Sequence, residues 1–127
     1  METVPAPALN AENLPGFNVH KPLDLPDLKG KVTILDFWTF CCINCIHIIP
    51  TLKKLEKRFP KSLAVIRVHS PKFPGEKNTD NVHKAIERYE IEHPIVHDSD
   101  FSIWKQYAVR AWPTLIFISP DGYILGQ

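Results

Sequence analysis

VTILDFWTFCCINC, residues 32–45, is the stretch that decides the fold of this chain of 127 residues. Its first half, Val32–Trp38, is an apolar run with the length and composition of a buried β-strand. The segment behind it, Ile46–Phe59, has the periodicity of a helix. Two cysteines, Cys42 and Cys45, stand at the junction of strand and helix. A thiol at the start of a helix is favoured as thiolate, the form that attacks disulfides, so this junction predicts redox chemistry.

The rest of the chain predicts an α/β domain around a mixed sheet. The first helix has one apolar stripe, Ile48, Leu52, Leu55 and Phe59, and Pro50 should kink this helix without ending it. The further predicted elements are a strand Leu63–Val68, a helix from Thr79 or Asp80 that buries Val82, Ile86 and Tyr89, a short strand Ile95–Val96, a short helix Asp98–Tyr107 with Ile103, Trp104 and Tyr107 inward, and a hairpin of Thr114–Ile118 and Tyr123–Leu125. Crossover helices require parallel strands and a hairpin gives antiparallel ones, so we expect a mixed parallel and antiparallel sheet flanked by helices.

Two parts of the chain are expected: a flexible N-terminal segment, residues 1–14, and one domain, residues 15–127. No helix follows the hairpin, so a C-terminal helix is missing and we expect the sequence to be a fragment of a longer chain. The N-terminus has no basic or apolar signal region and no stretch reaches the length of a membrane span, so we expect a cytoplasmic location. The net charge of +1 gives no electrostatic case for nucleic acid or an anionic membrane.

The three cysteines, Cys41, Cys42 and Cys45, lie too close together in the sequence to cross-link distant parts of the fold by disulfide bonds. In dithiol exchange an exposed thiolate attacks a substrate disulfide, and a second thiol resolves the mixed disulfide. Cys42 is the predicted nucleophile because it is nearer the helix start, and Cys45, one turn further, is the predicted resolving thiol. Asp36 stands in the middle of the apolar strand, where an isolated charge is costly or its pKa is raised.

These residues resemble the active-site strand and loop of the thioredoxins. The matching features are Leu35-Asp36-Phe37-Trp38 before the cysteine pair, Pro50 in the helix, and Val109-Arg110-Ala111-Trp112-Pro113-Thr114 before an apolar strand. Two longer strings, Asp36 to Cys45 and Val68 to Phe73, together with the segment around Pro113, resemble more closely the N-terminal thioredoxin-like domain of NHL-repeat-containing proteins, over residues 14–127. In that family a β-propeller follows the domain.

The resemblance implies a thioredoxin-like fold and a thiol–disulfide oxidoreductase that acts in cell redox homeostasis. It implies that Cys42 and Cys45 are the catalytic dithiol and that Asp36 exchanges protons with Cys45. It also implies a cis peptide bond before Pro113 and a substrate-binding set of Trp112, Pro113, Trp38, Ile43 and Asn44. No cofactor beyond the redox-active disulfide and no metal are expected. The expected partners are protein disulfide or dithiol substrates and a reductase of unknown identity, and the domain is expected to be a monomer.

The chain departs from the thioredoxin pattern at three positions. Cys41 stands where thioredoxins usually have Trp, and Ile43 and Asn44 replace Gly-Pro between the two cysteines. The resemblance therefore implies nothing about the reduction potential. Cys41 is either a competing partner for Cys45 or a small buried hydrophobe without a redox role, and the second is favoured.

Three alternatives stay open. Cys42 and Cys45 with His47 and His69 offer metal ligands, but no second pair at ligand spacing occurs, and these histidines are more typical of a helix surface and a strand end. A peroxiredoxin-type peroxidase would use Thr39 and Cys42, but Leu35 stands where that motif has Pro and no arginine partner is evident. A non-catalytic interaction domain would keep the fold and use the groove beside Trp112 for docking.

Overall fold

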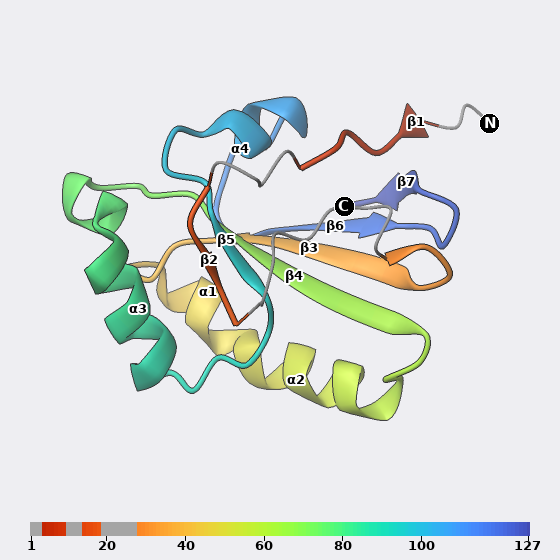
Figure 1. Cartoon of the computed structure of the whole chain (residues 1–127), viewed down its shortest axis with the longest axis horizontal. Helices are drawn as coiled ribbons and strands as arrows, with labels where there is room; N and C mark the ends of the chain where they lie inside the picture. Colours follow the sequence, from red (N-terminus) through yellow and green to blue (C-terminus); the bar gives the residue numbers. More distant parts are fainter. Residues whose placement is uncertain (1–3, 10–13, 19–27) are drawn as a thin grey trace.

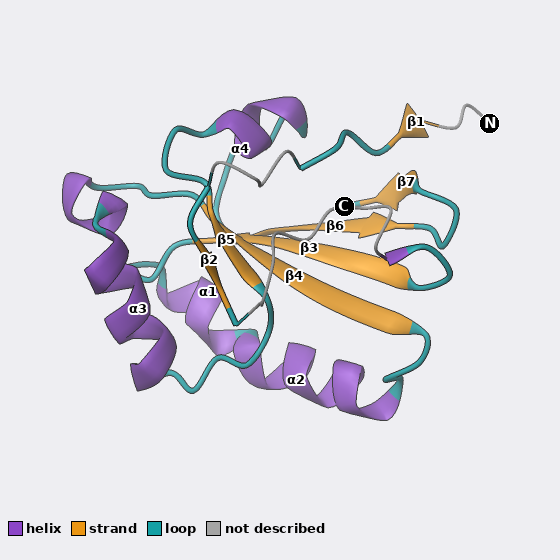
Figure 2. Cartoon of the chain, viewed as in Figure 1, coloured by secondary structure: helices purple, strands orange, loops and turns teal. Residues whose placement is uncertain are grey.

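The computed structural model describes residues 4–9, 14–18 and 28–127 and contains one mixed sheet with helices on both faces (Figure 1, Figure 2). The strands are β1 Val4–Pro5, β2 Gly16–Phe17, β3 Val32–Trp38, β4 Leu63–His69, β5 Ile95–His97, β6 Thr114–Ile118 and β7 Tyr123–Gly126. The helices are α1 Ile43–His47, α2 Ile49–Arg58, the short 3-10 helix η3 Pro74–Lys77, α3 Thr79–Arg88 and α4 Ser102–Gln106. Within the described residues, no helix has both the length and the apolar composition needed to cross a membrane.

The sheet has the strand order β1-β7-β6-β3-β4-β5-β2. At its centre β3 pairs parallel with β4 and antiparallel with β6, which confirms the predicted mixed sheet. The strand predicted over Val32–Trp38 is β3 with the same bounds, and β4 ends one residue later than predicted, at His69. Because β3 is covered on both faces, its sequence is a continuous apolar run without alternation.

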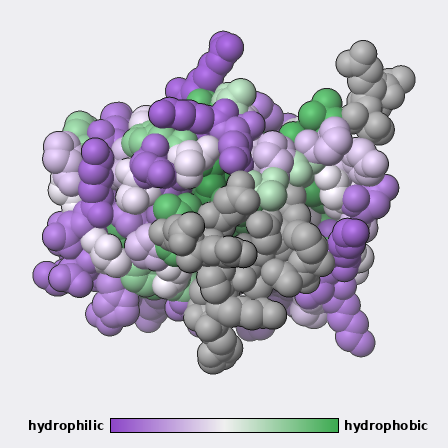
Figure 3. All heavy atoms as spheres, turned by 45° about the horizontal axis from the view of Figure 1, so that its top comes forward, coloured by the Kyte–Doolittle hydropathy of each residue, from purple (hydrophilic) through white to green (hydrophobic). Residues whose placement is uncertain are grey.

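Alternate residues of β3 belong to separate hydrophobic cores. Leu35 and Phe37 pack with Ile103 on the side of α4. Ile34 and Trp38 belong to the clusters on the side of α1, α2 and α3. Figure 1 shows these three helices below the sheet and α4 above it. Figure 3, turned so that the top of that view comes forward, shows mostly hydrophilic side chains with small apolar patches between them.

The first helical region differs from the prediction. The helix begins at Ile43, directly after Cys42 as expected, but it is interrupted at Ile48, so α1 and α2 are separate helices. Pro50 lies in the first turn of α2, where the amide hydrogen that proline lacks would have no partner in the helix. Pro50 therefore lies at the start of a new helix instead of kinking a continuous one.

The side chains of α2 that face the sheet also differ from the prediction. Ile49 and Leu52 are buried, whereas Leu55 is 37% and Phe59 is 45% exposed. The predicted apolar stripe is therefore wrong in its second half. Leu52, Leu55 and Phe59 follow one another at helical spacing, but only Leu52 is covered, whereas Leu55 and Phe59 lie at the exposed C-terminal end of α2.

The last helix is shorter than predicted, because α4 begins at Ser102 and not at Asp98. The buried carboxylate of Asp98 accepts the backbone N–H of Ile103 and that of Trp104, each at 3.0 Å. A carboxylate that accepts these first amides caps the helix from outside it. Ile103 and Tyr107 are buried as predicted, while Trp104 is only half-buried.

The N-terminal segment packs on the sheet in its described part. Val4 in β1 lies opposite Ile124 in β7. Leu9 is only 2% exposed within the core on the α4 side, and the Tyr107 hydroxyl donates to the Pro7 carbonyl at 2.6 Å. Residues 4–9 of the segment predicted to be flexible thus pack against the sheet in this structure, and its residues 1–3 and 10–13 lie outside the described residues.

Candidate active site

The two redox cysteines lie where β3 leads into α1. After β3 the N–H of Cys42 donates to the carbonyl of Thr39 at 3.1 Å and closes a turn. Cys42 is the N-cap of α1, and its Sγ accepts the backbone N–H of Cys45 at 3.2 Å. Its sulfur is also the more accessible of the two that form the dithiol, which suits Cys42 as the attacking group.

The three thiols differ in exposure, and all three are free. Cys45 is fully buried, Cys42 is half-buried and Cys41 is exposed. Burial, followed by the hydrogen bond with Cys42, raises the pKa of Cys45 well above its ordinary value. Cys45 is thus held as the neutral thiol. The prediction that Cys41 is a buried hydrophobe is wrong, because its side chain lies at the surface.

Asp36 does not stand alone in the core, because Arg67 of β4 lies directly opposite it in the parallel pair. Both side chains are fully buried, and the Arg67 Nε and Nη2 each lie 2.8 Å from the Asp36 Oδ2. Arg67 Nη2 also donates to the Cys45 carbonyl at 3.4 Å. Burial raises the pKa of the Asp36 carboxyl, and the Arg67 guanidinium opposes that rise. The other carboxyl oxygen, Asp36 Oδ1, has no hydrogen-bond partner among the described residues.

Trp38 lies beneath the dithiol and is fully buried. Its ring packs in the same cluster as Cys45, at 4.4 Å from the Arg67 guanidinium carbon and edge-on to His69 at 4.9 Å between ring centroids. A side chain without exposed surface cannot contact a substrate in this structure. The prediction of Trp38 as a substrate-binding residue is therefore wrong, and its place is in the packing that supports Cys45.

Two buried histidines form a hydrogen-bonded chain under the loop that carries the cysteines. The Phe40 N–H donates to His69 Nε2 at 3.4 Å, the two Nδ1 atoms of His69 and His97 lie 3.1 Å apart, and His97 Nε2 lies 2.9 Å from the Lys77 carbonyl. The Lys77 carbonyl only accepts, so His97 donates from Nε2 and accepts at Nδ1. The Phe40 amide only donates, so His69 accepts at Nε2 and donates from Nδ1 to His97. Each ring then carries one proton and is neutral. Burial, aided by His97 and Arg67, lowers the pKa of His69 to about 3.

The carboxylate of Glu76, in η3, holds the next amide of the same loop. Glu76 is only 1% exposed. Its Oε2 accepts the Cys41 N–H at 3.4 Å, and its Oε1 accepts the Phe73 N–H at 2.9 Å. Partial burial, and then the Glu76 charge, raise the pKa of Cys41. Two consecutive amides before the dithiol are thus fixed by side chains from β4 and η3.

The loop before β6 forms the other side of the site. The peptide bond between Trp112 and Pro113 is cis. The Trp112 indole N–H donates to the Ser70 carbonyl at 2.8 Å, and its ring packs on Trp104 with centroids 4.4 Å apart. Trp112 and Cys42 also both pack against the buried cluster that contains Cys45. The predicted Trp112 therefore packs on the same cluster as Cys42 and Cys45, and Pro113 follows it in the chain, while the predicted Ile43 and Asn44 lie exposed on α1.

Four supporting residues were not identified from the sequence: Arg67, His69 as a buried group, Glu76 and His97. The signal for Arg67 was a cation within an apolar strand run, the counterpart of Asp36 in the neighbouring run. Glu76 and His97 carry no comparable local signal, because their partners are backbone groups of distant segments.

The alternative of a metal centre has no support in the described part of the chain, where no three His, Cys, Asp or Glu side chains are grouped for metal binding. His69 is bound to Phe40 and His97, and His47 is exposed on α1. For the peroxidase alternative, Thr39 is fully buried, and the nearby Arg67 is paired with Asp36.

Comparison with known proteins agrees with this geometry. A family model described as thioredoxin-like matches residues 30–124. The chain is 48% identical over 102 residues to protein SUPPRESSOR OF QUENCHING 1, chloroplastic, of Arabidopsis thaliana, covering 80% of this chain and 10% of that protein. It is 46% identical over 117 residues to NHL repeat-containing protein 2 of Homo sapiens, covering 90% of this chain and 16% of that protein. The chain therefore spans only a small part of the length of these relatives.

A solved structure shares the fold. The thioredoxin domain of a thiol-disulfide oxidoreductase from Bacteroides vulgatus superposes with a TM-score of 0.79 at 25% sequence identity, over 99% of this chain and 87% of that one. The likeness extends over the sheet and the helices that carry the dithiol, so the predicted thioredoxin-like fold is confirmed.

Proposed function

This chain belongs to the thioredoxin-like family, and from that premise we propose that it is a thiol–disulfide oxidoreductase that exchanges a Cys42–Cys45 dithiol and disulfide with protein substrates in cell redox homeostasis. One observation carries the proposal: Cys42 is half-buried, caps α1 and accepts the N–H of Cys45, while Cys45 is buried behind it as a neutral thiol. Nucleophile and resolving thiol are thus distinguished by their surroundings, as sequential dithiol exchange requires.

The exchange proceeds in two displacements. The Cys42 thiolate attacks one sulfur of a substrate disulfide, so that a Cys42–substrate bond forms and the other substrate sulfur leaves as a thiolate and takes up a proton. Cys45 then loses its proton and attacks Cys42 Sγ, which releases the second substrate sulfur. The domain ends as the Cys42–Cys45 disulfide and the substrate as two thiols. An external dithiol donor reverses the change in the domain.

The second displacement needs a base, because Cys45 is protonated. Asp36 is the buried acid on the same side of β3, and its Oδ1 is the oxygen that Arg67 leaves unbound. We propose that Asp36 Oδ1 accepts the proton that Cys45 loses when it attacks the mixed disulfide. Arg67 holds the other oxygen and the Cys45 carbonyl, so it orients both groups.

A redox titration tests the proposal. The domain is equilibrated in glutathione or dithiothreitol buffers, its thiols are alkylated, and the pairing is read by mass spectrometry. We expect one reversible two-electron transition that converts Cys42 and Cys45, at a potential between about −270 and −120 mV. Cys45→Ser should accumulate a mixed disulfide on Cys42, and Cys42→Ser should not react. Failure to form a Cys42–Cys45 disulfide anywhere in that range would contradict the proposal.

The second candidate, a non-catalytic interaction domain, is favoured by one observation: the chain corresponds to 10% and 16% of the length of two relatives, one of which is named for its NHL repeats. Such a domain would bind its partner without the thiols. Cys42→Ser/Cys45→Ser would then leave partner binding intact, whereas the redox proposal predicts that this variant is inactive.

A further inference from the structure

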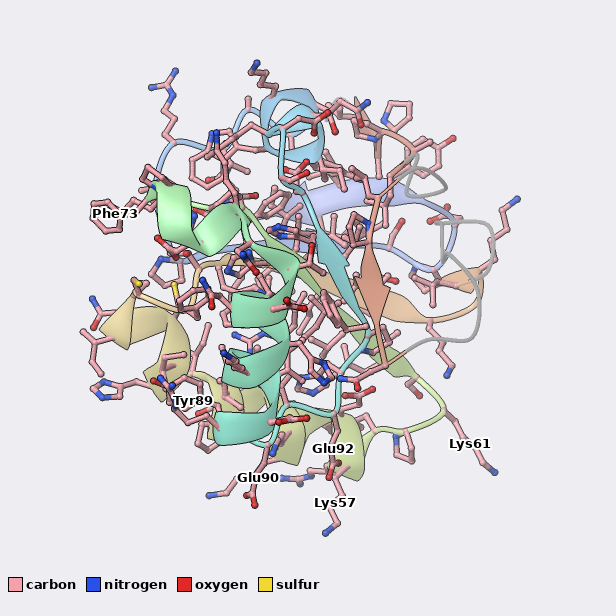
Figure 4. The ribbon with its side chains drawn as sticks, turned by 60° about the vertical axis from the view of Figure 1, so that its left-hand side comes forward. Lys57, Lys61, Phe73, Tyr89, Glu90 and Glu92 are labelled. Carbon is pink, nitrogen blue, oxygen red and sulfur yellow. The ribbon has the colours of Figure 1, made fainter. Side chains whose placement is uncertain are left out.

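A groove lies beside Cys41, the residue that precedes the dithiol. It has a volume of about 210 Å³ and is lined by Phe40, Cys41, Phe73, Gly75, Glu76, Asn81, Lys84, Ala85 and Arg88. We call it the Lys84 groove. Its walls come from η3 with the loop before it, from α3, and from the residues that precede Cys42. In Figure 4 the labelled Phe73 lies on the same outer edge of the molecule as the sulfur atoms at the start of α1.

The Lys84 groove combines an apolar lining with cations. Phe40, Phe73 and Ala85 supply apolar surface, and Phe73 is 53% exposed. Lys84 and Arg88 are exposed, and neither forms an ion pair within the described part of the chain. The carboxylate in the lining, that of Glu76, is buried and accepts two backbone N–H groups.

A third cation connects this groove with the loop of the cis proline. The Lys72 ammonium lies 5.5 Å from the centroid of Phe73 and 5.8 Å from that of Trp112. Lys84 and Arg88 thus line the groove that contains Cys41, and Lys72 lies at its Phe73 side, although the chain as a whole is almost neutral, with a net charge of +1. Cations without acidic partners in a groove next to the cysteine loop favour a ligand of negative charge at that place.

We propose that the Lys84 groove binds the segment of a protein substrate next to its reactive cysteine, and that it selects segments with acidic side chains. This inference rests on the proposed function, because it concerns the substrate of Cys42. The groove contains Cys41, whose Cα is about 3.8 Å from that of Cys42. A side chain held in the groove therefore belongs to a residue within a few positions of the attacked cysteine. Phe73 and Phe40 cover its apolar part, and Lys84 and Arg88 pair with its carboxylates.

The test uses the reduced domain and two short peptides that differ only in charge. Each carries one cysteine blocked as a disulfide with neutral 2-thiopyridine, flanked by Asp and Glu in one peptide and by Lys and Arg in the other. Release of thiopyridone measures kcat/KM for the attack by Cys42. At low ionic strength we expect the acidic peptide to react about five- to tenfold faster, and this ratio to approach one as salt is added.

Two charge-reversal variants separate the groove from the net charge. Lys84→Glu/Arg88→Glu should reverse or abolish the preference for the acidic peptide. Lys57→Glu/Lys61→Glu alters the net charge equally at the far end of α2, where both residues are labelled in Figure 4 away from Phe73. This control should keep most of the preference. Equal rates for the two peptides, or the same loss in both variants, would overturn the inference.

A small neutral disulfide, 2-hydroxyethyl disulfide, distinguishes failure of this inference from failure of the proposed function. If it oxidises the wild-type domain to the Cys42–Cys45 disulfide while the peptides react alike, only the selection by the groove is wrong. If it leaves the dithiol unchanged in the wild type, the proposed function fails and the inference fails with it. Circular dichroism of each variant shows that a lost preference is not a lost fold.

Discussion

Asp36 and Arg67 form a charged pair in the centre of the sheet, in register on two parallel strands. Removing two charges from water is costly, so a buried ion pair is no evidence of added stability. Its position indicates a role in the site instead, because the same guanidinium also donates to the Cys45 carbonyl. The pair therefore fixes the backbone at Cys45, although burying both charges costs desolvation free energy.

Replacing only one member of this pair should be far worse than replacing both. Arg67→Met leaves Asp36 without a counter-charge and should lower the free energy of unfolding by about 3–5 kcal/mol, whereas Asp36→Leu/Arg67→Met should recover most of the loss. In Arg67→Met the raised pKa of Asp36 is unopposed. In the unfolded variant the Asp36 carboxyl loses its proton near the ordinary pKa of Asp, while in the folded variant it keeps the proton to higher pH. The loss in the free energy of unfolding should therefore grow as pH rises above the ordinary pKa of Asp. Urea unfolding at pH 5 and pH 8 measures both effects, and a single variant as stable as the double one would contradict them.

The chain of His69 and His97 should make the fold sensitive to acid. The pKa of His69 is lowered to about 3, so below about pH 6.5 the unfolded chain takes up a proton that the folded chain cannot bind. The free energy of unfolding should fall by up to about 1.4 kcal/mol per pH unit from this residue as pH drops through that window. Urea unfolding between pH 4.5 and 7 measures the slope.

His69→Asn should reduce this slope by close to one proton, at the cost of lower stability at pH 7. His47→Asn is the matched control, because His47 is exposed on α1 and should leave the slope unchanged. Equal slopes for wild type and His69→Asn would show that His69 is protonated as easily in the folded state as in the unfolded one.

Cys41 should react slowly despite its exposure. Partial burial and the Glu76 carboxylate raise its pKa, so little thiolate is present at neutral pH. Glu76→Gln keeps an acceptor but removes the charge, and should shift the pH profile of Cys41 alkylation to lower pH. Rates for each cysteine, followed by mass spectrometry between pH 7 and 9, measure the shift. Cys41→Ser should leave the potential of Cys42 and Cys45 unchanged, and a large change would assign Cys41 a part in the exchange.

Helices and strands whose own sequence has a clear apolar pattern could be predicted. Those whose bounds depend on hydrogen bonds to distant residues could not. β3 is a seven-residue apolar run and was predicted with its bounds. The start of α4 depends on the Asp98 carboxylate, and two-residue strands such as β1 have no periodicity to read. The same division holds at the site, since Cys42, Cys45 and Asp36 form a local pattern, whereas Arg67 and Glu76 act on residues 31 and 35 positions away.

The N-terminal segment should contribute to stability through one side chain. Leu9 is 2% exposed in the core on the α4 side, and Val4 in β1 is 53% exposed. Leu9→Ala removes buried methyl groups and should lower the free energy of unfolding by about 2–4 kcal/mol. Val4→Ala should cost less than about 0.5 kcal/mol, as expected for an exposed position. Urea unfolding of both variants measures the difference, and a neutral Leu9→Ala would mean that this segment is not packed in solution.

Across the whole molecule the dithiol lies where three parallel strands end together. Trp38, His69 and His97 are in register at the ends of β3, β4 and β5. The loop that follows β3 therefore has strand ends beneath it, and His69 and Glu76 hold its amides from the side. Stability should thus extend from the sheet into this loop, although the loop has no regular secondary structure of its own.

Hydrogen exchange should show this distribution of stability directly. We expect the amides of β3, β4 and β6 to exchange most slowly, those of β1 and β2 at the sheet edges much faster, and those of Phe40 and Cys41 nearly as slowly as β3, because His69 and Glu76 accept them. His69→Asn should speed exchange at Phe40 and not at Cys41, and Glu76→Ala, which removes the acceptor of the Cys41 N–H, should do the opposite. Fast exchange of both amides in the wild type would mean that the loop opens independently of the sheet. The backbone before Cys42 would then not be held in place by His69 and Glu76.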